Sequence, residues 1–327
     1  MKILIVDIGG TAMKYAFMDE KGSFLTRGDV PTPLSGREEF LQTLETLFRT
    51  ESDVCGLALS LPGTVDYETG TLKNGGSLTY NYGFPLRSAL EERILHPVVL
   101  ENDGKCAALA EATYGALSDV RDGIVLVFGT NIGGGIVIDG KVHRGIHGAA
   151  GEVTYIIPND DGPAVENLFG ERCGVPGLLH LYAVAYRKRA EEEGTFDQTL
   201  LGRREGLDLT ENADYLVHRD VPDGKSFFQR WEEGDPVARE ALDTFTERIA
   251  TQIFNLQNVL DPERFAIGGG ISAQPVFIES IREHLARLYQ ACPRAVSFAE
   301  VVPCRFQNDA NLYGALATYL QVHKNPS

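Results

Sequence analysis

The chain has 327 residues, more than a single hydrophobic core usually supports, so we expect about two domains. Its 46 acidic and 30 basic residues give a formal charge of -16 at pH 7. This charge argues against nucleic acid and anionic membranes as partners, because both bind basic surfaces. No stretch reaches the roughly 18 consecutive apolar residues of a membrane-spanning helix. Five scattered cysteines without a CxxC pair are typical of reduced thiols, so we expect a cytoplasmic protein.

Strand-like and helix-like segments alternate along the first third of the chain, which is typical of an α/β protein. The predicted strands are 3–7, 14–18, 54–63 and 98–101. The predicted helices are 36–49, 86–94 and 103–116, where apolar residues recur at helical spacing. A glycine turn over 8–12 joins the first two strands.

The second part of the chain repeats the arrangement of strand, glycine turn and strand at 124–138. Helical periodicity then dominates 176–248, with a polar and charged stretch over 190–225 that we interpret as an insertion or exposed loop. Further on, the predicted elements are a helix over 236–259, a strand within 263–272 and a helix over 309–323. We place the domain boundary at 116–123, where the helical pattern breaks before the second glycine unit.

Three glycine clusters suggest anion binding by the backbone. In the first, Gly9 and Gly10 follow Asp7, and two glycines with positive φ can turn their N–H groups toward a phosphate. The alternative is a simple hairpin turn. The second cluster, 129–135, lies between apolar strands and is costly to order unless its backbone approaches something closely, the alternative being a flexible hairpin. The third, 268–270, ends a strand and would begin a helix.

Other familiar motifs do not fit this chain. No G-x-G-x-x-G opens a helix with an acid about 20 residues later, so a Rossmann site is not predicted. Gly224-Lys225-Ser226 resembles the end of a P-loop, but Arg219 occupies the required earlier glycine position, so we interpret the match as chance. His143 and His147 lack a third metal ligand nearby.

Six segments together resemble the ROK family of sugar kinases and repressors, in order and in spacing. They are 7–11, 61–66, 101–111, 129–145, 148–153 and 261–272. The resemblance implies an α/β fold with two actin-like (ribonuclease H-like) domains and a deep interdomain cleft. The smaller domain would be 1–118 with the terminal helix, about 309–327, returning to it, and the larger domain 119–308. ATP would bind the glycine loops, and the sugar the base of the cleft.

The resemblance also implies roles for individual residues. Asp103 would be the catalytic base that accepts the proton of the sugar hydroxyl, although an acid before a helix is often only an N-cap. The implied sugar-binding residues are Asn102, Asp103, Glu152, Tyr155, His180 and Gly76. The implied ATP-binding residues are Asp7, Gly9, Gly10, Thr11, Lys14, Gly129, Thr130, Asn131, Gly133, Gly134, Gly269 and Gly270, with Mg²⁺ near Asp7.

The chain departs from the family pattern at the usual zinc site. Tyr155 stands where the family has a histidine that binds zinc and sugar, and Cys173 is the one cysteine left of three. His180 aligns with the final acid of the motif. A single cysteine cannot complete a tetrahedral Cys₃His site, so we predict no structural zinc. Apolar packing through Leu168, Phe169, Leu178 and Leu179 would then hold the loop. This pattern resembles the zinc-less branch that includes β-glucoside kinases of Gram-positive bacteria.

The sequence therefore predicts an ATP-dependent sugar kinase that phosphorylates a hexose-type 6-hydroxyl, on glucose or a β-glucoside. The flat ring of Tyr155 favours stacking against a sugar or a second ring. A ROK-type transcriptional regulator is disfavoured by the acidic charge and by a first core strand that starts at residue 3. A non-catalytic sugar sensor is favoured by Tyr155 and His180 but disfavoured by the intact glycine motifs. We expect a homodimer, because family members are commonly dimers.

Overall fold

A computed structural model describes residues 1–74, 76–158, 162, 164–203, 216–295, 297–298 and 300–324. The chain divides into two compact units. Unit 1 comprises Met1–Val125, Gly134–Gly151 and Cys304–Ser327, and unit 2 comprises Leu126–Gly133 and Glu152–Pro303. No helix in these described residues has the length and apolar character needed to cross a membrane.

Unit 1 is built on a five-stranded sheet of order β3-β2-β1-β4-β7. The strands are β1 (Lys2–Ile8), β2 (Ala12–Asp19), β3 (Phe24–Pro31), β4 (Val54–Leu61) and β7 (Val98–Asn102). β1, β4 and β7 are parallel neighbours, whereas β2 pairs antiparallel with both β1 and β3. The sequence did not predict β3, because this edge strand is largely exposed and carries no run of buried apolar residues.

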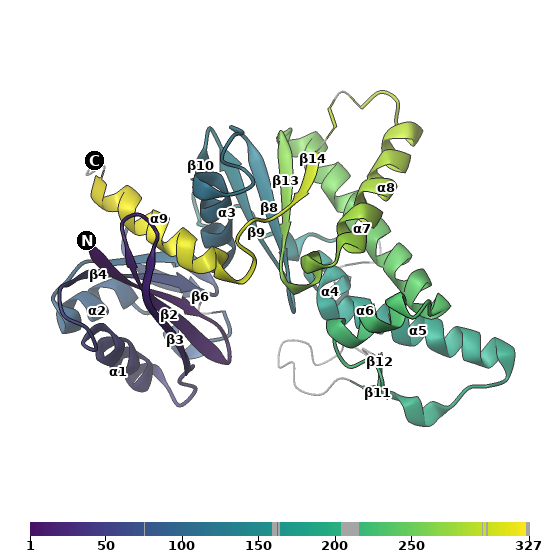
Figure 1. Ribbon diagram of the computed structural model, residues 1–327, viewed down its shortest axis with the longest axis horizontal. Helices are drawn as coiled ribbons and strands as arrows, with labels where there is room; N and C mark the ends of the chain where they lie inside the picture. The colour runs from purple at the N-terminus through teal and green to yellow at the C-terminus, as the bar shows by residue number, and fades with distance from the viewer. Residues whose placement is uncertain are drawn as a thin grey trace. The chain divides into compact units, whose positions relative to one another are not determined.

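Helices cover both faces of this sheet, with α1 (Arg37–Phe48) and α2 (Leu86–Ile94) on one side and the C-terminal helix α9 (Ala310–Lys324) on the other (Figure 1). The apolar residues of β1 alternate between these two faces. Leu4 and Val6 pack with α1 and α2. Ile3 and Ile5 pack with α9, which also lies against α3 (Asp103–Tyr114). Helices α3 and α9 approach closely at Gly314, where an added Cβ would lie 1.9 Å from the Cys106 carbonyl oxygen. The predicted apolar face of the last helix is thus confirmed.

Unit 1 also contains β5 (Thr64–Asp66), β6 (Thr71–Asn74) and the 3₁₀ turns η1 (Thr79–Asn81) and η6 (Gln307–Asp309). A second five-stranded sheet has the order β10-β9-β8-β13-β14. Its strands are β8 (Gly123–Phe128), β9 (Ile132–Ile138), β10 (Lys141–His143), β13 (Arg264–Gly268) and β14 (Glu300–Pro303), and the division into units falls within β8 and β9.

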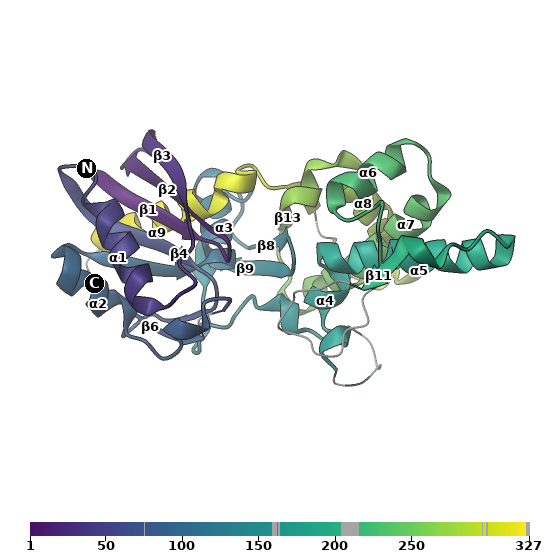
Figure 2. The same ribbon diagram turned by 90° about the horizontal axis from the view of Figure 1, so that it is seen from below.

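The helices of unit 2 pack on one another around α7, as Figure 2 shows in green and teal. They are α4 (Phe169–Cys173), α5 (Val175–Glu193), α6 (Gly224–Glu232), α7 (Pro236–Leu260) and α8 (Pro275–Ala291). Helix α7 confirms the predicted helix 236–259 and contacts α4, α5, α6 and α8. Asp235 caps its start by accepting a hydrogen bond from the N–H of Val237 at 2.8 Å.

Three local expectations need correction. The stretch 190–225 is not simply a loop: α5 continues to Glu193, and β11 (Leu201–Arg203) pairs antiparallel with β12 (Leu216–His218). Residues 204–215 of that stretch lie outside the described residues. The second glycine cluster is not wholly a loop either, because β9 begins at Ile132. The third is followed by the 3₁₀ turn η5 (Gly270–Ala273), and the next α-helix, α8, begins only at Pro275.

Candidate active site

Three parallel strands of unit 1 bring polar residues to the same sheet edge. In the strand register, Asp7 pairs with Ser60, Ser60 pairs with Glu101, and Leu61 pairs with Asn102. The carboxyl ends of parallel strands meet at one edge, which is where ligands bind in open α/β sheets. Asp7, predicted to bind ATP, and Asn102, predicted to bind the sugar, therefore lie on one edge of this sheet.

The Asp7 carboxylate is held in place by two donors from distant parts of the chain. Its Oδ1 accepts hydrogen bonds from Ser60 Oγ at 2.8 Å and from Asn311 Nδ2 of α9 at 2.9 Å. Burial raises the pKa of Asp7, while these two hydrogen bonds and the charge of Lys14 act in the opposite direction. A partly buried carboxylate of this kind is stabilised in its charged form when a cation lies beside it.

The first glycine turn leaves its residues accessible. Gly9, Gly10 and Thr11 are exposed, as is Lys14 on β2. The N–H of Gly9 donates to the Ala12 carbonyl oxygen at 3.0 Å and closes the turn. The expectation of positive φ at Gly9 and Gly10 is wrong, since neither of these two described residues adopts it. Glycine is required at position 9 because an added Cβ would lie 2.9 Å from the Ala12 carbonyl oxygen.

Asn102, not Asp103, is the N-cap of α3. Its Oδ1 accepts from the N–H of Lys105 at 3.1 Å, and its Nδ2 donates to the Gly63 carbonyl oxygen and to Asp103 Oδ1, both at 2.9 Å. Asn102 is 4% exposed, so capping and orientation of its neighbour account for its polar atoms. Asp103 is partly exposed at the first helical position and also accepts from the N–H of Gly104 at 2.8 Å.

The predicted sugar loop at Gly76 lies close to Asn102 through Gly63. Gly63 and Gly76 have φ of 90° and 57°, and a Cβ on Gly63 would lie 2.7 Å from the Gly76 nitrogen. The N–H of Gly76 donates to Asn74 Oδ1 at 2.9 Å. Because the Gly63 carbonyl oxygen also accepts from Asn102, the two turns and the start of α3 form one connected surface of unit 1.

Unit 2 contains a cavity of about 460 Å³ that is lined by three of the predicted ATP residues, Gly129, Thr130 and Gly270. Its other lining residues are Phe128, Val175, Gly224, Lys225, Phe228, Ile271 and Gln274. Gly269 has φ of 91°, and a Cβ there would lie 2.0 Å from the Phe128 carbonyl oxygen, so only glycine lets β13 end so close to β8. The volume suits a small ligand.

Two residues that line the cavity, Gly224 and Lys225, are not among the predicted ATP-binding residues. Gly224 and Lys225 lie at the start of α6, which Asp223 caps through a reciprocal contact with Ser226. Lys225 is exposed, and it brings a positive charge to a pocket whose other lining residues are uncharged. The Gly224-Lys225-Ser226 motif was the signal for this location, although it does not form a P-loop.

Asn131 fixes the second glycine turn from within unit 2. Its Oδ1 accepts from Thr154 Oγ1 at 2.6 Å, and its Nδ2 donates to Glu171 Oε1 at 3.3 Å. Gly170 packs against the same group, since a Cβ there would lie 1.7 Å from Asn131 Oδ1. The carbonyl oxygen of Gly129 accepts from the N–H of Val175 at 2.8 Å, which ties the turn to the start of α5.

Gly104 and Gly135 are required for packing within unit 1. A Cβ on Gly104 would lie 2.7 Å from the Gly134 carbonyl oxygen, and a Cβ on Gly135 would lie 2.3 Å from Ala108 Cβ. Strand β9 therefore lies against the backbone of α3, whose first residue is Asp103. Gly133 is partly exposed, whereas Gly134 is buried.

The predicted sugar residues of unit 2 differ in their surroundings. Glu152 directly precedes the 3₁₀ turn η2 (Val153–Tyr155). Tyr155 is the last residue of this turn and is 63% exposed. His180 is partly buried on α5, where its Nδ1 accepts from the N–H of Leu216 at 3.0 Å. Burial lowers the pKa of His180. The His180 ring thus holds β12 to α5.

The segment that aligns with the family zinc loop is packed by apolar groups. Phe169 and Leu178 are fully buried and Cys173 is 1% exposed, and burial raises the pKa of the Cys173 thiol to about 12. Within the described ranges, no three or more His, Cys, Asp or Glu side chains are grouped so that they could hold a metal ion.

Comparison with known proteins identifies relatives over nearly the full chain. The sequence profile of the ROK family matches residues 3–322. A β-glucoside kinase of Listeria innocua is 30% identical over 98% of both chains. A ROK family protein of Streptococcus pneumoniae, solved with sucrose, has a TM-score of 0.81 and 29% identity over 99% of both chains. A ROK family glucokinase of Streptomyces griseus, solved with glucose and AMPPNP, has a TM-score of 0.75 and 26% identity over 97% of this chain and 98% of that one. These matches confirm the predicted α/β two-domain fold.

Proposed function

This chain belongs to the ROK family and is a sugar kinase, and we propose that it transfers the γ-phosphoryl group of ATP to the 6-hydroxyl of glucose or a β-glucoside. The finer substrate class is carried by one observation. Tyr155 is 63% exposed and lies three residues after the candidate sugar ligand Glu152, where the family usually has a zinc-binding histidine. An exposed aromatic face can stack against a pyranose or a second ring. The weaker polar closure that follows from losing the histidine should then tolerate a substituent at the anomeric carbon.

Asp103 is the proposed general base. Its partly exposed carboxylate accepts the proton of the 6-hydroxyl while that oxygen attacks the γ-phosphorus, and the bond from the γ-phosphorus to the ADP oxygen breaks. Asn102 orients Asp103 through the 2.9 Å hydrogen bond to Oδ1. The other proposed sugar contacts are Glu152, Tyr155, His180 and Gly76. Phosphoryl transfer depends mainly on positioning and on neutralising charge, so the base is one contribution among several.

The nucleotide is assigned to the exposed turn at Gly9, Gly10 and Thr11 with Lys14, and to the cavity lined by Gly129, Thr130 and Gly270. Asn131, Gly133, Gly134 and Gly269 complete the proposed set of nucleotide-binding residues. Asp7 suits a hydrated Mg²⁺, because it is an oxygen donor at the strand edge whose burial calls for a compensating cation. Bound with ATP, Mg²⁺ would neutralise phosphate charge.

The organisation that accompanies this proposal is a smaller domain of residues 1–118 with about 309–327, and a larger domain of residues 119–308. We also propose a homodimer without structural zinc. Light scattering coupled to size-exclusion chromatography measures the dimer directly, and a single species at the mass of one chain contradicts it.

The deciding experiment is a coupled assay of kcat/KM with ATP and Mg²⁺. The substrates are glucose, methyl β-glucoside, cellobiose, fructose and N-acetylmannosamine. We expect the β-glucosides to be used at least comparably to glucose, and Tyr155→Ala to lower kcat/KM more for cellobiose than for glucose. Turnover of β-glucosides a hundredfold less efficient than that of glucose would refute the substrate proposal. That result would favour the second candidate, a glucokinase, which the similarity to the Streptomyces griseus enzyme supports.

A further inference from the structure

We propose that Glu101, Arg144 and Tyr67 form a buried positioning cluster that holds the Asn102–Asp103 turn to the segment leading into Glu152. The cluster lies entirely in unit 1, and none of its three residues is among those assigned above to ATP or sugar. The inference rests on the proposed function, since it assigns the cluster to the orientation of the base Asp103.

The contacts converge on the Glu101 carboxylate, which is 1% exposed on β7. Its Oε2 accepts from Arg144 Nη2 at 2.6 Å and from Arg144 Nε at 2.9 Å. Its Oε1 accepts from the N–H of Asn102 at 3.0 Å and from the Tyr67 hydroxyl. The Arg144 guanidinium carbon lies 4.8 Å from the centre of the Tyr67 ring. Both oxygens of the carboxylate are thus fully used.

The buried, negatively charged surroundings of Glu101 make its charged form costly for the stability of the fold. Burial, followed by the negative charge of Glu101, raises the pKa of Tyr67 far above its ordinary range, so its hydroxyl remains a donor. Asp7 and Asp103 add further negative charge near Glu101. The pKa of the buried Cys106 thiol shows this, because it is raised first by burial and then by the charges of Glu101, Asp7 and Asp103. Replacing a buried ion pair by apolar residues is often neutral or stabilising, so such a pair is weak evidence of a role in stability. Its geometry suits a role in orientation.

Two segments that carry proposed active-site residues meet at this cluster. On one side, the N–H of Asn102 bonds to Glu101, and the Asn102 side chain caps α3 and contacts Asp103. On the other side, Arg144 begins the stretch 144–151, which ends directly before Glu152. That stretch contains Gly145, Gly148 and Gly151 with φ of 70°, 77° and 85°.

Glycines at positive φ hold a turn only if other contacts fix it, because they have more conformational freedom than other residues. The Arg144 carbonyl oxygen accepts from the N–H of Ala150 at 3.1 Å, which closes the stretch on itself. The Arg144 side chain then anchors this closed turn to Glu101. Loosening that anchor is expected to disorder the base and the turn together.

The test is Glu101→Gln, which preserves shape but removes the charge. We expect kcat to fall at least tenfold, with KM for ATP unchanged within twofold, because the nucleotide residues are untouched. We also expect the acid limb of the kcat–pH profile to shift to lower pH. The Arg144 cation, no longer neutralised by Glu101, favours the charged form of Asp103. A purely structural role would not move that limb.

Companion variants keep the test decisive if Glu101→Gln is poorly folded. Arg144→Lys retains the charge but loses the two-nitrogen contact, and Tyr67→Phe removes one donor. We expect both to lower kcat less than Glu101→Gln. In the double variant Glu101→Gln with Arg144→Lys, we expect a loss smaller than the product of the single losses, since residues that act as a unit are non-additive.

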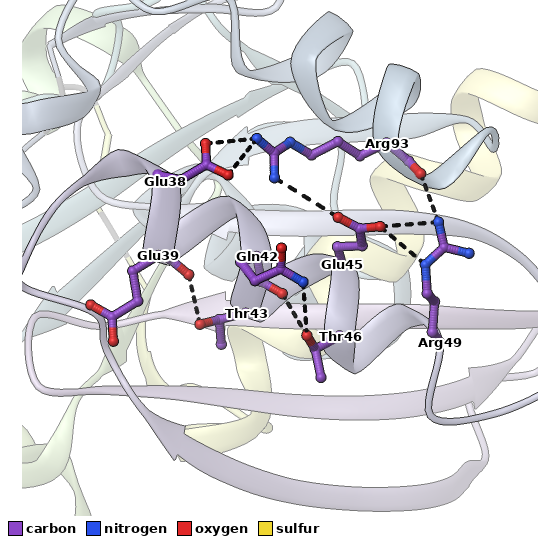
Figure 3. A network of polar contacts seen from close by, with 8 residues as sticks. All are labelled: Glu38, Glu39, Gln42, Thr43, Glu45, Thr46, Arg49 and Arg93. Atoms are coloured by element: carbon purple, nitrogen blue, oxygen red, sulfur yellow. Dashed lines mark hydrogen bonds and ion pairs between the residues drawn. The ribbon is translucent and has the colours of Figure 1, made fainter.

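The matched control is the exposed ion pair of Glu38 and Arg93 in the same unit (Figure 3). Arg93 Nη2 lies 2.7 Å from Glu38 Oε2, comparable to Arg144 and Glu101, but the Glu38 side chain is 77% exposed. Glu38→Gln and Arg93→Lys are expected to keep kcat within twofold. Exposed pairs contribute little, because water screens them.

The inference is overturned if Glu101→Gln and Arg144→Lys keep kcat within twofold of the parent, or if their losses appear in KM for ATP rather than in kcat. An unshifted acid limb in a folded Glu101→Gln also overturns it. The proposed function fails separately, through absence of sugar phosphorylation by the parent protein or undiminished turnover in Asp103→Asn.

Discussion

Replacing Asp103 by asparagine tests the proposed base most directly. The carboxylate accepts from the N–H of Gly104 at 2.8 Å and from Asn102 Nδ2 at 2.9 Å, both at Oδ1, and an amide oxygen can accept both. Charge-assisted hydrogen bonds are roughly twice as strong as neutral ones, which contribute about 1 kcal/mol. The variant therefore loses about 2 kcal/mol of stability, a fraction of the roughly 5–15 kcal/mol that stabilises a typical domain.

The loss in turnover is expected to be much larger. A general base contributes about 10²–10⁴ in rate, or about 3–5 kcal/mol of activation free energy. We therefore expect Asp103→Asn to fold, to bind glucose with nearly unchanged affinity by calorimetry, and to lose at least a hundredfold in kcat. Asp19→Asn is the matched control, because the Oδ1 of Asp19 likewise accepts two hydrogen bonds, here from the N–H groups of Lys21 and Ser23, but Asp19 lies at the end of β2 and is not a proposed active-site residue. A kcat for Asp103→Asn within a few-fold of the parent would remove Asp103 from the mechanism.

Three further outcomes are expected. Lys225→Ala should raise KM for ATP about tenfold or more while KM for the sugar stays constant. The reason is that a hydrogen bond to a charged group contributes about 1.5–3 kcal/mol. An unchanged KM for ATP would exclude Lys225 from nucleotide binding. The purified protein should contain no stoichiometric zinc and keep its Tm in a strong chelator once Mg²⁺ is replenished, and about one zinc per chain by elemental analysis contradicts this. Burial lowers the pKa values of His180 and His218, so the folded state binds fewer protons than the unfolded state, and stability should be lost as pH falls below about 6.5. The loss in the free energy of unfolding is at most about 1.4 kcal/mol per pH unit for each histidine. A Tm that stays constant between pH 7.5 and 5.5 would argue against histidine protonation as the cause. So would a fall in Tm that is the same in His218→Gln as in the parent.

Local patterns in the sequence predicted most elements of the fold. Apolar runs indicated β1, β4 and β7, and helical spacing indicated α1, α2, α3, α7 and α9. The main failure was β3, an edge strand whose backbone pairing with β2 needs no buried side-chain pattern. The stretch 190–225 failed for a similar reason, because β11 and β12 are short and only partly buried where described.

The candidate site was predictable only where its residues form motifs. The turn after Asp7 and the Asn102–Asp103 pair each follow a strand, and their order along the chain carried the family resemblance. The reasons for individual glycines were not predictable. Gly104 is required because its Cβ would clash with the backbone of Gly134, thirty residues later, and not because of a positive φ or a ligand.

The sequence by itself thus determined the α/β class, most helices and strands, and the family to which the chain belongs, because these depend on periodicity and motifs within short segments. The tertiary structure decided which distant residues meet. It brought Asn311 to Asp7, Arg144 to Glu101 and Lys225 to the cavity beside Gly129. Such contacts depend on how strands pair and helices pack across tens to hundreds of residues, and no local propensity in the chain encodes them.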